Sequence, residues 1–328
     1  MAEVKQRTYK VVQGWEKAPA SANRLDAVGV GTDSRDRVYL ITRQRSQVLV
    51  YEADGTFVRA WGEGRFTDRT HGLTVGPDDA VWCVDDGSHR VQKFSPEGEL
   101  LLELESAGRP APQSGYDGRT LESITRGGPP FNRPTNLAVA PSGDLYVSDG
   151  YGNCRVHRYS ADGKLIQSWG EPGSRPGQFI LPHGIWVAAD GRVLVADREN
   201  DRIQVFSPSG EYLTEWAALR PTDLCVDREG LVYVSELGRR PGPRPCNLGE
   251  APEQPGRVSV LDQSGNVVAR FGASESDRCA PGNFVAPHCI AVDAKGSVYV
   301  GEVTYTIGVR PGLVPADCHT FQKFERVG

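Results

Sequence analysis

Three of the six histidines stand at one position of a phrase that the sequence repeats. The segments are Thr70-His71-Gly72-Leu73, Pro182-His183-Gly184-Ile185 and Pro287-His288-Cys289-Ile290. The intervening copies carry Asp26, Thr135 and Thr222 there, so the histidines fall on every second repeat. Three imidazoles with an open fourth position form the ligand set of a catalytic zinc site, and other divalent metals accept the same nitrogens. The spacing therefore predicts a metal site, preferentially for zinc.

The repeated phrase consists of an apolar tetrad, an Asp-x-x-Gly type of turn and a strand that ends in Tyr-Val-x-Asp/Glu. Five copies and one divergent copy occur, at 73–86, 137–150, 185–198, 224–237, 290–303 and 28–43. The segments that follow four of them alternate polar and apolar residues around a turn, the pattern of β-hairpins; they are 90–104, 155–170, 202–216 and 257–272.

Each repeat thus supplies about four strands, and a unit of that size cannot bury both faces of its sheet alone. Six units stacked radially bury them and leave a central channel. We therefore predict an all-β, six-bladed β-propeller that forms a single domain over residues 1–328. The last copy lacks a fourth strand, and the segment 8–15 resembles the missing piece. We expect this N-terminal strand to complete the last blade and close the ring.

In a six-bladed propeller of this kind, every second blade directs one histidine toward the axis, so three imidazoles converge. The alternative is that each histidine packs or hydrogen-bonds separately. His89, His157 and His319 show no such phase and are expected to be surface or structural residues.

The ends of the inner strands carry further polar groups. Asp85, Asp149 and Asp197 recur in register, and we expect them to tie the blade turns through hydrogen bonds to the backbone. Arg43, Tyr151 and Arg198 depart from the repeat consensus. An arginine fork suits a substrate carboxylate, and a tyrosine beside a cation and a metal is a candidate general base. These three residues are the predicted catalytic groups.

Composition excludes several classes of protein. Lysine plus arginine number 37 against 42 aspartate plus glutamate, a net charge of −5 that argues against nucleic-acid binding. No apolar run reaches the ~18 residues of a membrane span, and the start lacks the apolar segment of a secretory signal. The seven cysteines show no CxxC and no regular spacing. We expect reduced thiols, no disulfide framework and a cytoplasmic location.

Three insertions interrupt the repeats, at 105–130, 238–256 and 304–319. All fall between strands and are expected to be loops. Long loops on a propeller rim either cover a ligand or are solvated padding.

The stretch 131–206, with its Asp-Gly-Tyr, Pro-His and Ala-Asp-Arg-Glu-Asn elements, resembles the NHL-repeat propellers and, among them, the peptidyl-α-hydroxyglycine α-amidating lyases. The resemblance extends more weakly over 25–300. It implies zinc bound by His71, His183 and His288, a catalytic Tyr151, and active-site arginines at Arg43 and Arg198. The implied reaction splits R-CO-NH-CH(OH)-COO⁻ into an amide and glyoxylate.

The sequence departs from that family in several places. The family's structural calcium uses two backbone carbonyls, matching Val30 and Leu73, and an aspartate where this chain has Cys289, which argues against calcium here. Ala286 replaces a methionine. Gly152, Leu194 and Val205 occupy the positions of the family's half-cystines.

Three functions remain open from the sequence. One is a zinc lyase acting on an α-hydroxyglycine-type carboxylate, including small ones such as ureidoglycolate. The second is a metal-dependent hydrolase, or a lyase of another substrate class, on the same three histidines. The third is a non-enzymatic NHL propeller that binds a protein partner on its rim.

Overall fold

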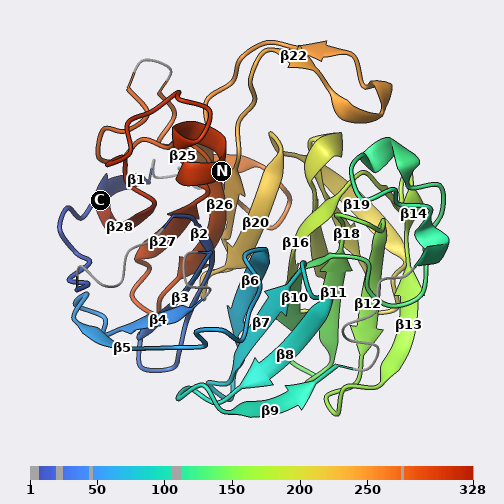
Figure 1. Ribbon diagram of the computed structural model, residues 1–328, viewed down its shortest axis with the longest axis horizontal. Helices are drawn as coiled ribbons and strands as arrows, with labels where there is room; N and C mark the ends of the chain where they lie inside the picture. The colour runs from blue at the N-terminus through green and yellow to red at the C-terminus, as the bar shows by residue number, and fades with distance from the viewer. Residues whose placement is uncertain (1–6, 20–24, 44–46, 105–111, 275–276, 328) are drawn as a thin grey trace, which may run out of the picture.

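Six four-stranded antiparallel sheets surround a central axis (Figure 1). The structure is a computed structural model that describes residues 7–19, 25–43, 47–104, 112–274 and 277–327. The first strands of consecutive blades contact one another in a closed ring, in the order β2, β6, β10, β16, β20, β26 and back to β2. The predicted six-bladed propeller is confirmed.

The blades follow the chain order, with each inner strand first. Blades 1 and 2 contain β2 (Ala27–Thr32), β3 (Val38–Thr42), β4 (Val48–Tyr51), β5 (Phe57–Trp61), β6 (Thr70–Val75), β7 (Val81–Asp85), β8 (Arg90–Phe94) and β9 (Leu100–Glu103). Blades 3 and 4 contain β10 (Pro134–Val139), β11 (Leu145–Asp149), β12 (Arg155–Tyr159), β13 (Leu165–Trp169), β16 (Pro182–Val187), β17 (Val193–Asp197), β18 (Arg202–Phe206) and β19 (Tyr212–Ala217). Blades 5 and 6 contain β20 (Pro221–Val226), β21 (Val232–Glu236), β24 (Arg257–Leu261), β25 (Val267–Phe271), β26 (Pro287–Val292), β27 (Val298–Glu302), β28 (Phe321–Val327) and β1 (Thr8–Val11).

Short elements fill the connections between strands. They are β14 (Glu171–Pro172), β15 (Gln178–Phe179), β22 (Gly242–Pro243), β23 (Glu250–Ala251), the 3-10 turns η1 (Pro112–Ser114), η2 (Leu121–Ser123), η3 (Arg198–Asn200) and η4 (Pro245–Asn247), and the π-turn η5 (Tyr305–Val309). No helix within the described ranges is long and apolar enough to cross a membrane.

Burial explains the strand sequences. The second strands of all six blades are buried along their whole length because neighbouring blades cover both of their faces. The outer strands, such as β5, alternate half-buried and exposed residues because one face meets solvent. β-Branched residues and aromatics such as Tyr39 and Tyr233 fill the inter-blade layers, as a pleated buried surface requires.

The N-terminal segment closes the ring as predicted. β1 pairs antiparallel with β28, from Thr8 opposite Val327 to Val11 opposite Phe324. The strand ends at Val11, earlier than the expected residue 15. Trp15 continues as an anchor, because its buried indole donates a 3.0 Å hydrogen bond to the Ala53 carbonyl of the first blade.

The acidic residues at the strand ends are structural, as expected. Asp85, Asp149 and Asp197 each accept a backbone N–H from the segment that precedes their own blade's inner strand, at 2.6, 2.8 and 2.8 Å. Glu236 and Glu302 do the same in the fifth and sixth blades at 2.7 Å. A carboxylate satisfies these buried donors and so fixes the turn that leads toward the axis.

The three histidines outside the repeat phase are structural as well. His157 is fully buried, with Ser168 Oγ at 2.7 Å and Asp149 at 3.3 Å. His319 lies 3.0 Å from Glu302, and His89 accepts the Arg133 N–H.

The prediction that all cysteines are reduced thiols is wrong for one pair. Cys279 and Cys318 form a disulfide that joins the segment before β26 to the insertion 304–319. The two residues are 39 apart with no spacing motif, and the propeller rather than the sequence pattern brings them together. The expected cytoplasmic location therefore loses its support from the cysteines. The other five are free: Cys83, Cys154, Cys225, Cys246 and Cys289.

This pairing is testable by counting thiols. We expect alkylation of the denatured, unreduced protein to label five of the seven cysteines, because a disulfide does not react. Intact-mass measurement before and after reduction gives the count, and seven labels without reduction would contradict the disulfide.

Candidate metal centre and its cavity

The three in-phase histidines meet on the propeller axis. His71, His183 and His288 are the second residues of β6, β16 and β26, and all three are buried. Their ring centroids are 4.6 to 4.8 Å apart. One nitrogen from each ring lies within 4.8 Å of the others, so the three imidazoles converge on one small region at the axis.

Each imidazole is oriented by the blade that follows it. His71 Nδ1 donates to the Thr135 carbonyl at 2.7 Å, and His183 Nδ1 donates to the Thr222 carbonyl at 2.5 Å. His288 Nδ1 donates to the Val28 carbonyl at 3.1 Å. Three blades thus supply rings, and the three blades between them supply carbonyls that fix each ring's tautomer and direction.

The strand registers correct one assignment made from the sequence. Ala27 pairs with Thr42 as Thr70 pairs with Asp85, so Val28 rather than Asp26 is the first-blade equivalent of His71. Asp26 lies two residues earlier. The divergence of the first copy hid this offset.

Small residues after two of the histidines allow this approach. A Cβ at Gly72 would lie 2.6 Å from the Thr135 oxygen, and one at Gly184 would lie 2.8 Å from the Thr222 oxygen. The third histidine is followed by Cys289, and its hydrogen bond is the longest of the three. Glycine at the first two positions lets neighbouring strands come close enough for the short Nδ1–H···O contacts.

Burial keeps the three rings neutral. It lowers the pKa of His71 and of His183 well below the usual 6.5, and neighbouring cationic groups act in the same direction. The pKa of His288 falls to about 3 through burial and the guanidinium groups of Arg43 and Arg198. A neutral imidazole whose Nδ1 is committed to a carbonyl presents its Nε2 lone pair, which is the form that binds a metal.

The residues present fit a divalent metal. His288 Nε2 is buried and has no hydrogen-bond partner among the described residues, which is costly unless another group satisfies it. Three neutral imidazole nitrogens aimed at one point form a ligand set that suits zinc and leaves a further position open. The three histidines would hold the ion.

Tyr151 and Arg198 lie directly against this ring. Tyr151 Oη is 3.1 Å from His71 Nε2 and 3.2 Å from His183 Nε2, and Arg198 donates to the same oxygen at 3.2 Å. Gly150 permits this placement, because a Cβ there would lie 2.1 Å from the Pro182 oxygen. The structure therefore brings the predicted tyrosine and one predicted arginine to the convergent histidine nitrogens.

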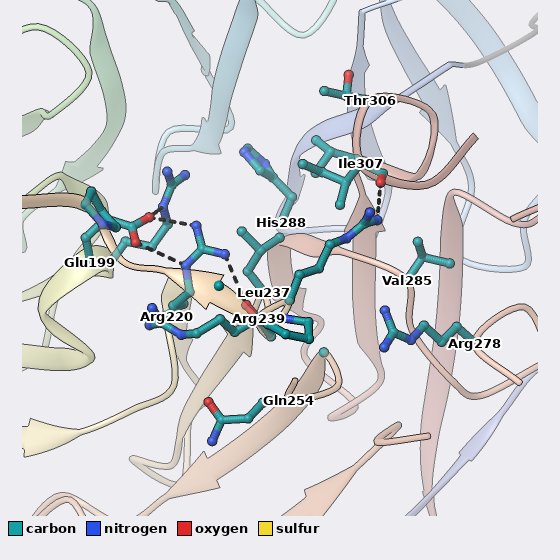
Figure 2. A pocket seen from close by; sticks show the side chains of 18 of the residues that line it. Glu199, Arg220, Leu237, Arg239, Gln254, Arg278, Val285, His288, Thr306 and Ile307 are labelled. Atoms are coloured by element: carbon teal, nitrogen blue, oxygen red, sulfur yellow. Dashed lines mark hydrogen bonds and ion pairs between the residues drawn. The ribbon is translucent and has the colours of Figure 1, made fainter. Parts of the chain in front are cut away.

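The second predicted arginine lines the same cavity. Arg43 NH1 is 3.4 Å from Asp26, whose carboxylate also accepts the Thr306 N–H at 3.1 Å. The cavity has a volume of about 420 Å³, and Arg43, Tyr151, Arg198 and His288 all contribute to its wall. Figure 2 shows His288 beyond Leu237 and Arg220 in this cavity. All six predicted site residues thus lie at or beside one cavity.

Sequence reasoning missed two further arginines at the site. The guanidinium of Arg69 lies 5.8 Å from the centre of the Tyr151 ring, and that of Arg198 lies 5.5 Å from it. Arg220 donates to Glu199, which also pairs with Arg198. Arg69 and Arg220 both stand two residues before the histidine position or its equivalent. This shared position within the repeat was a signal that could have found them.

The structural calcium site that the family resemblance implies would require an aspartate where this chain has a cysteine. Cys289 occupies the aspartate position, is buried, and directs its Sγ toward the Ala27 carbonyl at 3.7 Å. The absence of a structural calcium stays a prediction.

Two insertions form part of the cavity wall. Residues 238–243 and Gln254 come from the insertion that carries β22 and β23, and Thr306 and Ile307 come from η5. Figure 1 shows the β22 segment projecting at one rim of the propeller. The insertion 105–130 contacts the insertion 238–256, since Glu122 accepts the Cys246 N–H at 2.6 Å. Residues 105–111 lie outside the described ranges.

The fold and the inner histidines together define an NHL-type propeller with a candidate metal centre. An NHL-repeat model matches residues 131–159 and 179–206. Human NHL repeat-containing protein 3 is 30% identical over 319 residues, covering 90% of this chain and 81% of that protein. The mouse protein of the same name is 34% identical, covering 78% and 70%. The chain belongs to this family of NHL repeat-containing proteins.

Relatives named as lyases match as well. Peptidyl-alpha-hydroxyglycine alpha-amidating lyase 1 of Drosophila melanogaster is 33% identical over 281 residues, covering 79% of this chain and 47% of that protein. The chain thus spans about half the length of this relative. It is a lyase-like propeller.

Solved structures share the fold alone. A streptogramin B lyase superposes with a TM-score of 0.59 at 14% identity, and the match covers 99% of this chain and 100% of that lyase. A gluconolactonase of Xanthomonas campestris, at TM-score 0.58 and 14% identity, covers 93% and 87%.

Removing one ring tests the ligand set. We expect His183→Ala to lose bound metal almost completely, because two imidazoles hold a divalent ion far more weakly than three. Metal content per chain, measured by plasma mass spectrometry after zinc loading and gel filtration, reports the change. His89→Ala is the matched control, since His89 lies outside the ring. Equal metal in both variants would contradict the site.

The neutral rings also predict a pH dependence. Since the folded protein keeps His288 neutral down to about pH 3 while the unfolded chain takes up a proton near pH 6.5, unfolding becomes easier as the pH falls below 6.5. We expect metal-free His288→Gln to lose about 1.3 kcal/mol less free energy of unfolding than the wild type between pH 7 and pH 5.5. Denaturant titrations at pH 7 and 5.5 measure the difference, and parallel losses would contradict the low pKa.

Proposed function

We propose that this chain is a metal-dependent lyase, with zinc as the preferred metal, that cleaves an N-acyl-α-hydroxyglycine into an amide and glyoxylate. The observation that carries the proposal is the position of Tyr151 Oη, 3.1 and 3.2 Å from the free nitrogens of two neutral, convergent histidines. The relatives named as α-hydroxyglycine amidating lyases support the same reaction class.

A divalent ion on His71, His183 and His288 would supply Lewis-acid polarisation of a substrate oxygen. The chain's own groups account for the proton. Tyr151, acting as a phenolate, accepts the proton of the substrate hydroxyl on Oη, and the C–N bond breaks as the carbonyl of glyoxylate forms. The departing amide nitrogen takes up this same proton, which returns Tyr151 to its starting form. No water is consumed, so the reaction is an elimination rather than a hydrolysis.

Arg198 and Arg43 have different roles in the proposed reaction. Arg198 donates to Tyr151 Oη at 3.2 Å and to Glu199 at 2.9 Å, so its guanidinium is fixed beside the oxygen that carries negative charge before it accepts the proton. Arg43 lies 3.4 Å from Asp26 and 3.5 Å from the Thr70 carbonyl, and it lines the same cavity. We assign Arg43 to the glyoxylate carboxylate, since a guanidinium fork binds a carboxylate through two hydrogen bonds. Arg198 acts mainly on the tyrosine.

Replacing one oxygen tests the role of the tyrosine. We expect Tyr151→Phe to keep its bound zinc and to lose about 10²-fold or more in kcat, because general base catalysis contributes at least that much. Glyoxylate release from α-hydroxyhippurate, followed with a coupled reductase, measures the rate. Tyr212→Phe, on outer strand β19, is the matched control and is expected to be unaffected.

Two results would contradict the proposal. Full activity in Tyr151→Phe removes this residue from the mechanism. Consumption of substrate without glyoxylate identifies a hydrolase on the same histidines, and a purified protein that binds no divalent metal favours an interaction propeller.

A further inference from the structure

The cavity outside the histidine ring holds more guanidinium groups than the proposed chemistry uses. Beyond Arg43 and Arg198, four further arginines line it: Arg220, Arg239, Arg240 and Arg278. Glu199 is the sole carboxylate among the described residues of this lining. Such a wall favours an anionic ligand and disfavours a cationic one.

Carboxylates behind the wall neutralise only part of this charge. Glu199 is shared between Arg198 at 2.9 Å and Arg220 at 2.7 Å. Asp201 is shared between Arg239 at 2.7 Å and Arg244 at 2.6 Å. Each of these carboxylates therefore serves two guanidinium groups, and a surplus of positive charge remains beside the cavity.

Arg240 and Arg278 form the outer part of this wall. Arg240 donates to the uncharged carbonyl of Ile307 and makes no ion pair with any residue the structure describes. Arg278 pairs with Glu253 and stands next to Cys279, whose disulfide to Cys318 anchors this segment to the insertion carrying Ile307. Burial and the nearby guanidinium of Arg278 lower the pKa of Arg240, and Glu253 acts in the opposite direction.

The geometry separates this pair from the inner arginines. Figure 2 shows Arg220 beside Glu199 on one side of the cavity and Arg278 on the other, with Leu237 between them. The cavity volume of about 420 Å³ falls in the range of about 300–1,000 Å³ for pockets that enclose whole small molecules. There is room for a ligand that extends from the histidine ring to the outer arginines.

We propose that the acyl part of the substrate carries a second carboxylate, which Arg240 and Arg278 bind at the outer end of the cavity. This inference rests on the proposed function and names its substrate class: the α-hydroxyglycine conjugate of a dicarboxylic acid. The carboxylate at the reacting end lies with Arg43, and the carboxylate at the far end lies with Arg240 and Arg278, which line the same cavity. The insertion 238–256 is then a specificity element.

A pair of matched substrates tests the proposal. α-Hydroxy-N-glutarylglycine and α-hydroxy-N-pentanoylglycine differ in a terminal carboxylate against a methyl group. We expect kcat/KM to be about tenfold higher for the glutaryl compound, as for other charge-assisted contacts. Arg240→Gln and Arg278→Gln should each abolish that preference through KM and leave the pentanoyl rate within about twofold. Arg192→Gln is the control, because Arg192 pairs with Asp190 outside this cavity.

A binding measurement separates this inference from the proposed function. We expect calorimetry with the zinc-loaded protein to show glutarate binding about tenfold more tightly than butyrate, and Arg240→Gln to remove the difference. If neither substrate yields glyoxylate, the lyase proposal fails. Glutarate binding then still shows whether Arg240 and Arg278 form a carboxylate-binding subsite. Equal turnover of both substrates would overturn the proposal that the substrate carries a second carboxylate. So would glutarate binding that is no tighter than sulfate binding and that Arg240→Gln leaves unchanged.

Discussion

The candidate site depends on three hydrogen bonds that cross from one blade to the next. Each Nδ1–H of His71, His183 and His288 donates to a main-chain carbonyl of the following blade, at 2.7, 2.5 and 3.1 Å. These bonds fix the tautomer, and with it the direction of every Nε2 lone pair. A propeller with six blades can alternate ring and carbonyl around its axis, and this alternation makes a three-nitrogen centre from one repeated strand.

Two electrostatic effects oppose each other at this centre. Burial and the neighbouring arginines keep the imidazoles neutral, which leaves them free to bind a metal. The same arginines repel a dication, by about 4 kcal/mol for two unit charges 4 Å apart near a protein surface. Coordination by three imidazoles outweighs a repulsion of this size, since structural zinc binds with about 10–16 kcal/mol. In the proposed reaction an anionic substrate would offset the remaining charge, so we expect metal and carboxylate to bind cooperatively.

Much of the fold and of the inner site is visible in the sequence, because both follow the repeat. The blades, the ring closure, the strand-end carboxylates and the three in-phase histidines each occupy a fixed repeat position. What could not be predicted comes from residues that only the closed ring brings together. The Cys279–Cys318 disulfide joins the segment before β26 to the insertion 304–319 without any spacing motif, and Arg240 and Arg278 line one cavity from separate loops. Val28 was missed for a simpler reason: the first copy of the repeat diverges, and the sequence comparison placed the histidine-equivalent position two residues too early, at Asp26.

X-ray absorption spectroscopy of the zinc-loaded protein at the zinc edge tests the metal centre most directly. We expect one zinc per chain with three imidazole nitrogens at about 2.0–2.1 Å and an oxygen in the remaining position. A first shell with fewer than three imidazoles, or a spectrum that His288→Gln leaves unchanged, would contradict a metal centre at the propeller axis.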